Sequence, residues 1–333
     1  MNDQTTARPL ASAERDRSGG PNLAALAKLP MLPVLVVAFA ALSASVDGFA
    51  SAANLANMAR LFAPLVIAGI GLTFVFLLGE IDLSVGSVLG LASVLGAFVM
   101  RSTESVWLGI AVIVATGAAI GALNGLVIAW FRFSSFIHTL GVLVTARAIA
   151  MLITGGHSVG RLPTAALEFG RGSFLGLPSL LWVAFLVYGL AHLLLRHTVT
   201  GRQFFLVGAN RRGAVFAGLA VPRTRFLAFL FSGTLAGLAG ACIVLRLGSG
   251  GPILGDNLLL MAIASVVLGG TSVFGGEGGV FRTATGALVV VMLDKGLNLL
   301  GLEFYDQAIV MGLVILLGSA LGGHLYRRRT GRA

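Results

Sequence analysis

Hydrophobic runs about as long as a membrane span dominate the chain, and short polar or glycine-rich breaks separate them. A helix needs roughly twenty mostly apolar residues, with a range of about 17–25, to cross the hydrocarbon core of a bilayer. This template predicts ten spanning helices. They lie at residues 31–46, 62–79, 83–100, 106–130, 136–153, 179–195, 226–246, 258–274, 280–300 and 307–325. The pattern therefore predicts an all-α polytopic membrane protein.

Composition supports this fold class and excludes a soluble globular protein and a disordered chain. Of the 333 residues, 57% are hydrophobic and only 11% are charged, against roughly a quarter charged in soluble domains. A soluble surface would need more ionisable groups, and a disordered chain would not carry so much apolar content. The 46 glycines fit a membrane bundle, because small residues let helices approach closely.

Basic residues predict the orientation, because Lys and Arg are retained on the cytoplasmic side of a membrane. Ten spans place both termini on one side, and we expect that side to be cytoplasmic. Sixteen basic residues then lie inside and five outside. Residues 1–30 are expected to be a polar cytoplasmic tail, 31–325 the membrane domain and 326–333 a basic cytoplasmic tail. The net charge of +10 is thus a topology signal rather than a nucleic-acid surface.

The longest internal loop, residues 196–225, contains six arginines and no acidic residue. Such a loop can simply fix topology. This one also contains Asn210, a suitable helix N-cap, followed by Gly218 and Pro222, which are helix stop signals. We therefore expect a helix of about two turns on the cytoplasmic face, where it could serve as a docking surface.

Two carboxylates stand between apolar segments in Gly-Glu-Ile-Asp-Leu-Ser-Val-Gly (79–86). Charged groups at membrane depth are costly and tend to mark function. Asp82 or Ser84 could instead accept hydrogen bonds from the free amides at the start of the next helix. Both interpretations can hold together, since a break between helices belongs where the backbone lines a polar cavity.

A second break, the glycine-rich segment 269–279, is either a flexible turn or a functional element, namely a hinge or a second half-helix site. Several enzyme and nucleotide-binding motifs are missing from the sequence: it has no P-loop, no His-Glu-x-x-His and no Gly-x-Ser-x-Gly. The single Cys242 excludes disulfides and cysteine-based zinc sites within one chain. We therefore expect no catalytic site, no metal and no cofactor in this chain.

Five ordered motifs resemble those of a known family. They are Gly-Glu-Ile-Asp-Leu-Ser-Val-Gly (79–86), Leu-Asn-Gly-Leu (123–126) with Phe-Ile-His-Thr-Leu-Gly (136–141), Gly-Arg…Val-Gly-Ala-Asn (201–210), Ile-Ala-Ser-Val-Val-Leu-Gly-Gly-Thr-Ser (263–272) and Gly-Leu-Asn-Leu-Leu-Gly (296–301). Together they resemble the ribose/xylose/galactoside permease family of sugar-importing ATP-binding-cassette (ABC) transporters, over about residues 50–320.

The resemblance implies a multi-pass permease of the bacterial inner membrane with three kinds of protein partner. These are cytoplasmic ATP-binding cassette subunits, which bind the ATP, a second permease copy and a periplasmic sugar-binding protein. It also implies that the basic-loop helix docks on the ATPase. The expected coupling residues are Gly208, Asn210, Arg211, Arg212, Gly213, Ala214 and Gly218. The candidate residues of a translocation pathway or hinge are Glu80, Asp82, Ser84, Asn124, Thr139, Thr271, Ser272 and Asn298.

The chain departs from the family pattern in two places, and two other function classes stay open. Asn210-Arg-Arg-Gly-Ala stands where the family usually has Asn-x-Glu-Ala-Ala, and Asp294-Lys-Gly stands where Asn-Gly is more usual. The alternatives are an ion-coupled secondary transporter and an intramembrane enzyme. The sequence leaves open which sugar or polyol is carried, and whether the permease pair is a homodimer or a heterodimer.

Overall fold

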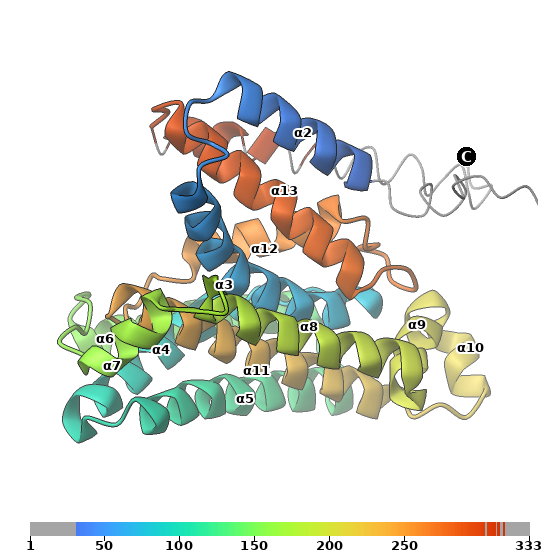
Figure 1. Ribbon diagram of the computed structural model, residues 1–333. Coiled ribbons are helices and arrows are strands. Elements are labelled where there is room, and N and C mark those ends of the chain that lie inside the picture. The colour runs from blue at the N-terminus through green and yellow to red at the C-terminus, as the bar shows by residue number, and fades with distance from the viewer. Residues whose placement is uncertain (1–30, 304, 311, 314–315, 317–333) are drawn as a thin grey trace, which may run out of the picture.

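The computed structural model describes residues 31–303, 305–310, 312–313 and 316, which form a bundle of helices (Figure 1). The helices are α2 (Met31–Ser45), α3 (Ala52–Leu77), α4 (Val85–Thr103), α5 (Val106–Trp130), α6 (Ser135–Thr154), α7 (Thr164–Arg171), α8 (Ser179–His197), α9 (Val199–Ala209), α10 (Arg211–Phe216), α11 (Val221–Leu247), α12 (Asp256–Leu268) and α13 (Val280–Leu299). A two-stranded hairpin, β1 (Ser173–Phe174) with β2 (Leu177–Pro178), precedes α8.

Six helices of the described chain are long and apolar enough to cross a membrane: α3, α4, α5, α6, α8 and α11. The predicted spans at 258–274 and 31–46 are shorter, because α12 has 13 residues and α2 has 15. Helix α13 has 20 residues but carries Arg282, Asp294 and Lys295. Most of the predicted span at 307–325, like both predicted tails, lies outside the described residues.

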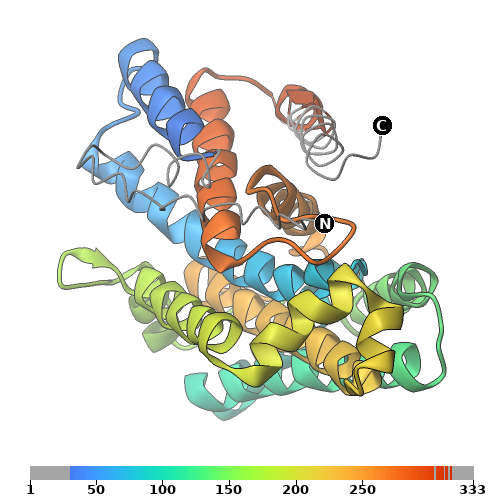
Figure 2. The same cartoon turned by 90° about the vertical axis from the view of Figure 1, so that its right-hand side faces the viewer.

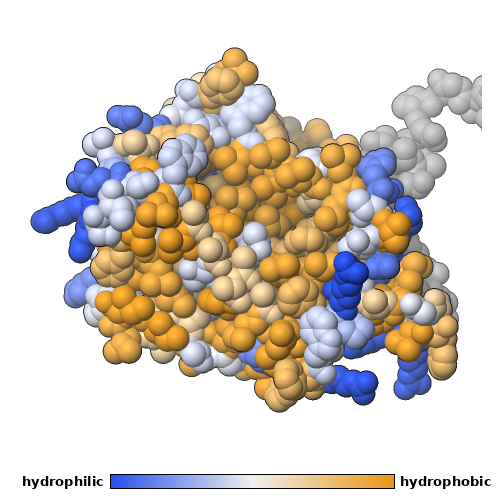
Figure 3. Space-filling model, turned by 90° about the horizontal axis from the view of Figure 1, so that it is seen from below, coloured by the Kyte–Doolittle hydropathy of each residue, from blue (hydrophilic) through white to orange (hydrophobic). Residues whose placement is uncertain are grey.

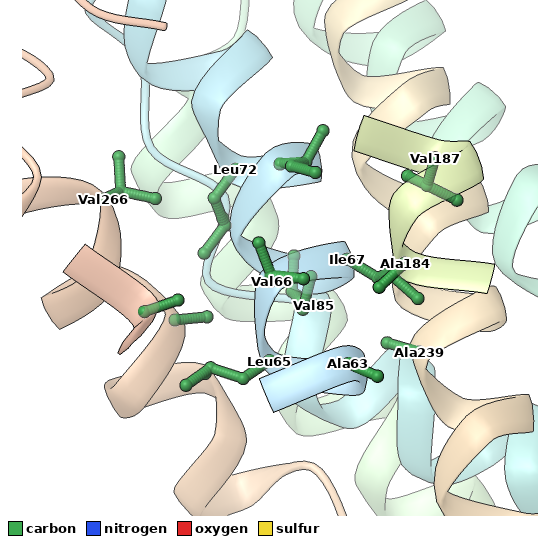
Figure 4. Packing of buried hydrophobic residues seen from close by; sticks show 14 of the residues in the cluster. Ala63, Leu65, Val66, Ile67, Leu72, Val85, Ala184, Val187, Ala239 and Val266 are labelled. Atoms are coloured by element: carbon green, nitrogen blue, oxygen red, sulfur yellow. The ribbon is translucent and has the colours of Figure 1, made fainter. Parts of the chain in front are cut away.

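Helix α3 is the central element, and its sequence explains why. From Phe62 to Leu77 every residue is buried, as expected for a helix that is apolar on all sides. It packs against α8, α11, α12 and α13. Figure 4 shows Leu65 and Ile67 of α3 in this core, with Ala184 on α8 and Val266 on α12. The helix begins ten residues before the predicted span, where the Ser51 hydroxyl accepts from the Asn54 amide at 3.3 Å.

Helices α5 and α11 approach each other through glycine. A Cβ added at Gly117 would lie 2.3 Å from the Gly233 carbonyl oxygen, and one added at Gly121 would lie 2.5 Å from that of Phe229. No side chain fits at such distances, so glycine is required for this contact. The composition predicted that glycine would allow close helix packing, and this contact confirms that role for Gly117 and Gly121.

The helices are arranged in two groups. Helices α5 and α11 run side by side and α8 packs on α3, while α2 and α13 pack together above them (Figures 1 and 2). At one end of the bundle lie α9 and α10, and at the other lie α7 and the hairpin (Figure 1). The face seen from below in Figure 3 is largely apolar, with hydrophilic residues gathered toward its two ends. This distribution fits a surface that meets lipid or another hydrophobic partner between two aqueous layers.

Candidate functional site

The linker between α3 and α4 carries the two carboxylates that the sequence singled out. Helix α3 ends in a left-handed turn at Gly79, whose φ is 68°, and the Glu80 amide donates back to the Val75 carbonyl at 3.2 Å. A Cβ at position 79 would lie 2.8 Å from the Phe274 carbonyl oxygen. Glycine is therefore needed here both for the turn and for close packing.

Asp82 is the centre of a buried hydrogen-bond network. Its Oδ1 accepts from the Ser84 amide at 3.0 Å and from the Ser84 hydroxyl at 2.6 Å. Its Oδ2 accepts from the Ser232 hydroxyl of α11 at 2.7 Å. Asp82 thus contacts the amide just before α4, close to the predicted capping role, while Ser84 makes no side-chain cap bond. The same carboxylate joins the linker to α11.

The network continues into α5 and α6. The Asn124 side-chain amide donates to the Ser84 hydroxyl at 2.9 Å, and its Oδ1 lies 3.2 Å from His138 Nε2. The Thr139 hydroxyl accepts from the Leu83 amide at 3.1 Å. Five predicted pathway residues (Glu80, Asp82, Ser84, Asn124 and Thr139) are therefore brought together around one linker.

Glu80 forms a buried ion pair with Arg225 at the start of α11. Their side chains are 8% and 6% exposed, and Arg225 Nε donates to Glu80 Oε1. Arg225 also donates to the Ile128 carbonyl at 2.6 Å, which fixes the guanidinium between α5 and the linker. Buried charges persist only when they are paired in this way. Glu80 Oε2 is buried and has no hydrogen-bond partner within the described part of the chain.

A second arginine, Arg211 of α10, reaches the same carboxylate. Its NH1 lies 3.6 Å from Glu80 Oε1, and its side chain is 54% exposed. Burial lowers the pKa of Arg211, the charge of Arg225 lowers it further, and Glu80 raises it. These groups line a polar pocket of about 610 Å³, to which Arg132 and Ser135 also contribute. One carboxylate thus sits among three arginines.

Helix α10 confirms the predicted helix start at Asn210. The Asn210 side chain accepts from the Gly213 amide at 2.9 Å, as an N-cap does. The helix has six residues, close to the predicted two turns, and ends at Phe216, two residues before Gly218, whose φ is 75°. Pro222 does not end it but stands in the first turn of α11, a position that proline tolerates. Helix α9, which fills residues 199–209, was not predicted from the sequence.

The glycine-rich segment 269–279 packs against the end of α3 and the end of α9. The Gly276 amide donates to the Leu77 carbonyl at 2.9 Å. A Cβ at Gly208 would lie 1.8 Å from the same carbonyl oxygen, so the end of α9 touches the end of α3. Thr271 and Ser272 lie in this segment and bond within it: Thr271 accepts from the Gly279 amide, and Ser272 from the Phe274 amide. The structure shows no bond from them to the Asp82 network.

Two polar residues inside predicted spans lie away from this cluster. Asn298 is exposed near the end of α13 and is not brought together with the other candidates. Arg147 of α6 pairs with Asp256 at the start of α12. Among the residues that the structure describes, no group of three His, Cys, Asp or Glu side chains could hold a metal ion.

Sequence reasoning missed two residues that complete the cluster. Ser232 is one of three hydroxyl residues in a largely apolar helix, with Thr224 and Thr234, and Arg225 counted only as a topology charge. Neither has a local signal, because each meets its partner across about 150 residues of chain. The assembled site holds polar side chains and one buried ion pair on a non-helical linker. Its hydrogen bonds and ion pair join α5, α6 and α11 to the linker between α3 and α4.

Comparison with known proteins gives a consistent result. Residues 54–318 match the family described as the permease component of the branched-chain amino acid transport system. The chain is 39% identical to the ribose import permease protein RbsC of Escherichia coli K12 over 255 residues, covering 75% of this chain and 79% of the relative. It is 35% identical to the L-arabinose ABC transporter permease protein AraH of Azospirillum brasilense, covering 78% and 76%.

A third relative, the D-allose transport system permease protein AlsC of Escherichia coli K12, is 34% identical and covers 77% of this chain and 79% of its own. No solved structure matches the chain. The matched region takes in α3 to α13 and therefore the whole polar cluster. The chain accordingly belongs to this family of transport-system permease components.

Proposed function

We propose that this chain is the membrane-spanning permease subunit of an ABC importer that moves a sugar or sugar-like solute and is driven by a separate ATPase subunit. One observation carries the proposal: the similarity to the ribose import permease extends over three quarters of the chain. The family is one of transport permeases, which favours transport over intramembrane catalysis. The arabinose and allose relatives favour a sugar as the solute over a branched-chain amino acid.

The proposed topology has ten spans in the bacterial inner membrane with both termini in the cytoplasm. Helices α2, α12 and α13 would join the six long apolar helices, and a tenth would follow residue 305. The distribution of arginines supports this. Arg60 donates to the Arg171 carbonyl at 3.0 Å and Arg171 to that of Arg246 at 3.1 Å, so three predicted outside arginines lie together. Predicted inside arginines surround α9 and α10 instead.

Helix α10 is the proposed docking element for the ATPase. Ala214 is buried against the body of the protein, whereas Phe216 is 91% exposed and Val215 is 58% exposed. Exposed aromatic and aliphatic side chains on a basic loop are suited to anchor a protein partner. Gly208 and Gly218 would set the position of this element, since Gly208 packs against α3 and Gly218 turns the chain just after the helix.

The proposed route from the docking helix to the interior passes through Glu80. Movement of α10 would carry Arg211 along the Glu80 carboxylate, whose free Oε2 offers a second position for a donor. Asp82 lies two residues further along the same linker and holds α11 through Ser232. The linker could thus convert a movement at the ATPase interface into a shift of α4 against α11, as alternating access requires.

The remaining partners complete the proposal. A second permease copy would form the pathway with this one, and a periplasmic sugar-binding protein would deliver the solute. Solute affinity would then reside mainly in that binding protein. The largely apolar face of Figure 3 is available for lipid or for the second copy.

The test is ATP-driven sugar uptake by the complex purified from the source bacterium through a tag on this chain. Ala214→Pro should abolish solute-stimulated ATP hydrolysis without preventing membrane insertion, because it removes the bond from the Ala214 amide to the Asn210 carbonyl. Ala220→Pro is the matched control: its φ of −76° suits proline. Full uptake by Ala214→Pro would contradict the docking role, and uptake without any ATPase would contradict the function.

A further inference from the structure

We infer that the groove between α8 and α13 binds one anionic phospholipid, with its acyl chains in an apolar channel and its phosphate among three arginines. This inference rests on the proposed topology, which puts these arginines on the cytoplasmic side, and it is independent of the transported solute. It rests on two hollows that share a wall.

The first hollow is a channel of about 590 Å³ with almost entirely apolar walls. It is bounded by α2, α3, α8 and α13. Characteristic lining residues are Phe39, Met58, Phe62, Phe185 and Leu288. No hydrogen bond or ion pair of the described residues closes it, and its polar lining is minimal, so it suits hydrocarbon rather than a sugar.

The second hollow, of about 660 Å³, is basic. It lies where α8 ends, α9 begins and α13 begins. Arg196, Arg202 and Arg282 line it together with His192.

The two hollows form one groove. Phe281, in the first turn of α13, lines both. Along α8 the lining runs in helical register from Leu181 through Phe185 and Tyr188 to His192 and Arg196. Tyr188 and His192 stack at the junction, with ring centroids 5.9 Å apart. One face of α8 thus changes from apolar to basic along its length, as a lipid does from tail to phosphate.

Among the described residues, no acidic side chain neutralises the charges of the basic end. None of the three arginines forms an ion pair with an acidic side chain of the described residues. Arg282 donates to the Gly270 carbonyl at 2.9 Å. This bond orients the guanidinium, but a neutral carbonyl does not neutralise its positive charge. Glu277, exposed in the neighbouring loop, forms no described ion pair with them. A phosphodiester provides the missing negative charge and accepts from the guanidinium fork.

The occupant follows from this combination. A soluble anion would bind the arginines and leave the apolar channel empty. A neutral lipid would occupy the channel and leave the arginines unpaired. Basic pockets between membrane helices on the cytoplasmic side are suited to anionic headgroups. An anionic diacyl phospholipid of the cytoplasmic leaflet satisfies both ends.

The test uses the full chain in detergent, titrated with phosphatidylglycerol and followed by native mass spectrometry. Arg196→Gln combined with Arg202→Gln should weaken phosphatidylglycerol binding about 25-fold, since each basic residue near an anionic lipid contributes about fivefold, or about 1 kcal/mol. Arg223→Gln, an exposed arginine outside the groove, is the matched control and should leave binding unchanged. Phosphatidylcholine should bind more weakly than phosphatidylglycerol to the unaltered chain.

Two further experiments distinguish a phospholipid from free phosphate and from other occupants of the groove. Ala284→Phe narrows the channel and should weaken binding of long-chain phosphatidylglycerol more than that of a dihexanoyl analogue. Inorganic phosphate should not displace the long-chain lipid at equal concentration. Equal binding of phosphatidylcholine, full displacement by phosphate, or no saturable binding because another part of the chain fills the groove would each overturn the inference.

Discussion

The buried ion pair between Glu80 and Arg225 can be tested by a double-mutant cycle. Both side chains are less than a tenth exposed, and removing one partner of a buried pair costs about 3–5 kcal/mol because the other charge stays buried. We expect Glu80→Leu to lower the free energy of unfolding by about that amount. Arg225→Met should cost less, since Arg211 remains 3.6 Å from the Glu80 carboxylate.

The double variant Glu80→Leu/Arg225→Met should be much less destabilised than the sum of the two single variants, because apolar side chains of similar size can replace a buried pair at little cost. Arg211→Gln is the control: the Arg211 side chain is 54% exposed, so its loss should change stability by less than about 1 kcal/mol. The assay is unfolding of the purified chain in mixed micelles by added SDS, followed by circular dichroism. Additive single effects, or an equal cost for Arg211→Gln and Glu80→Leu, would refute the reasoning.

Three further outcomes are expected. In the purified complex, Arg211→Gln should lower the sugar transported per ATP hydrolysed while leaving stability nearly unchanged; an unaltered ratio would remove Arg211 from the coupling route. Gly117→Ala should lower the unfolding free energy by about 1–3 kcal/mol through overpacking against α11. Gly189→Ala, which meets no atom within 4 Å, should raise it by up to about 1 kcal/mol, and the same SDS titration compares the two. Asp82→Ala should cost about 1–3 kcal/mol by leaving the Ser84 amide without its acceptor, whereas Asp82→Asn keeps an acceptor and should cost less by the same measurement.

Much of the helical framework could be predicted from hydrophobicity alone. The predicted span at 106–130 coincides with α5, and those at 136–153 and 179–195 differ from α6 and α8 by one or two residues. The method failed where apolar residues do not form helix: the end of the span at 258–274 is part of the glycine-rich segment, and α12 stops at Leu268. It also missed the first turns of α3, which are polar enough to resemble a loop.

The candidate site could be predicted only in part. Glu80 and Asp82 were found because carboxylates are costly between apolar segments. Arg225 and Ser232 could not be found, because only the packing of α11 against α3 and α5 brings them to the linker. Asn298, also expected on the pathway, lies exposed near the end of α13 and apart from the other candidates, so its role stays a prediction.

The central claim is that this chain is a membrane gate driven by a separate ATPase. The most direct measurement is accumulation of labelled sugar by proteoliposomes that contain the purified complex, compared with proteoliposomes that contain this chain alone. We expect the complex to accumulate sugar in a way that requires ATP hydrolysis, is abolished by vanadate and is unaffected by ionophores. The chain alone should accumulate none. Accumulation by the chain alone, driven by a proton or sodium gradient and collapsed by ionophores, would contradict it.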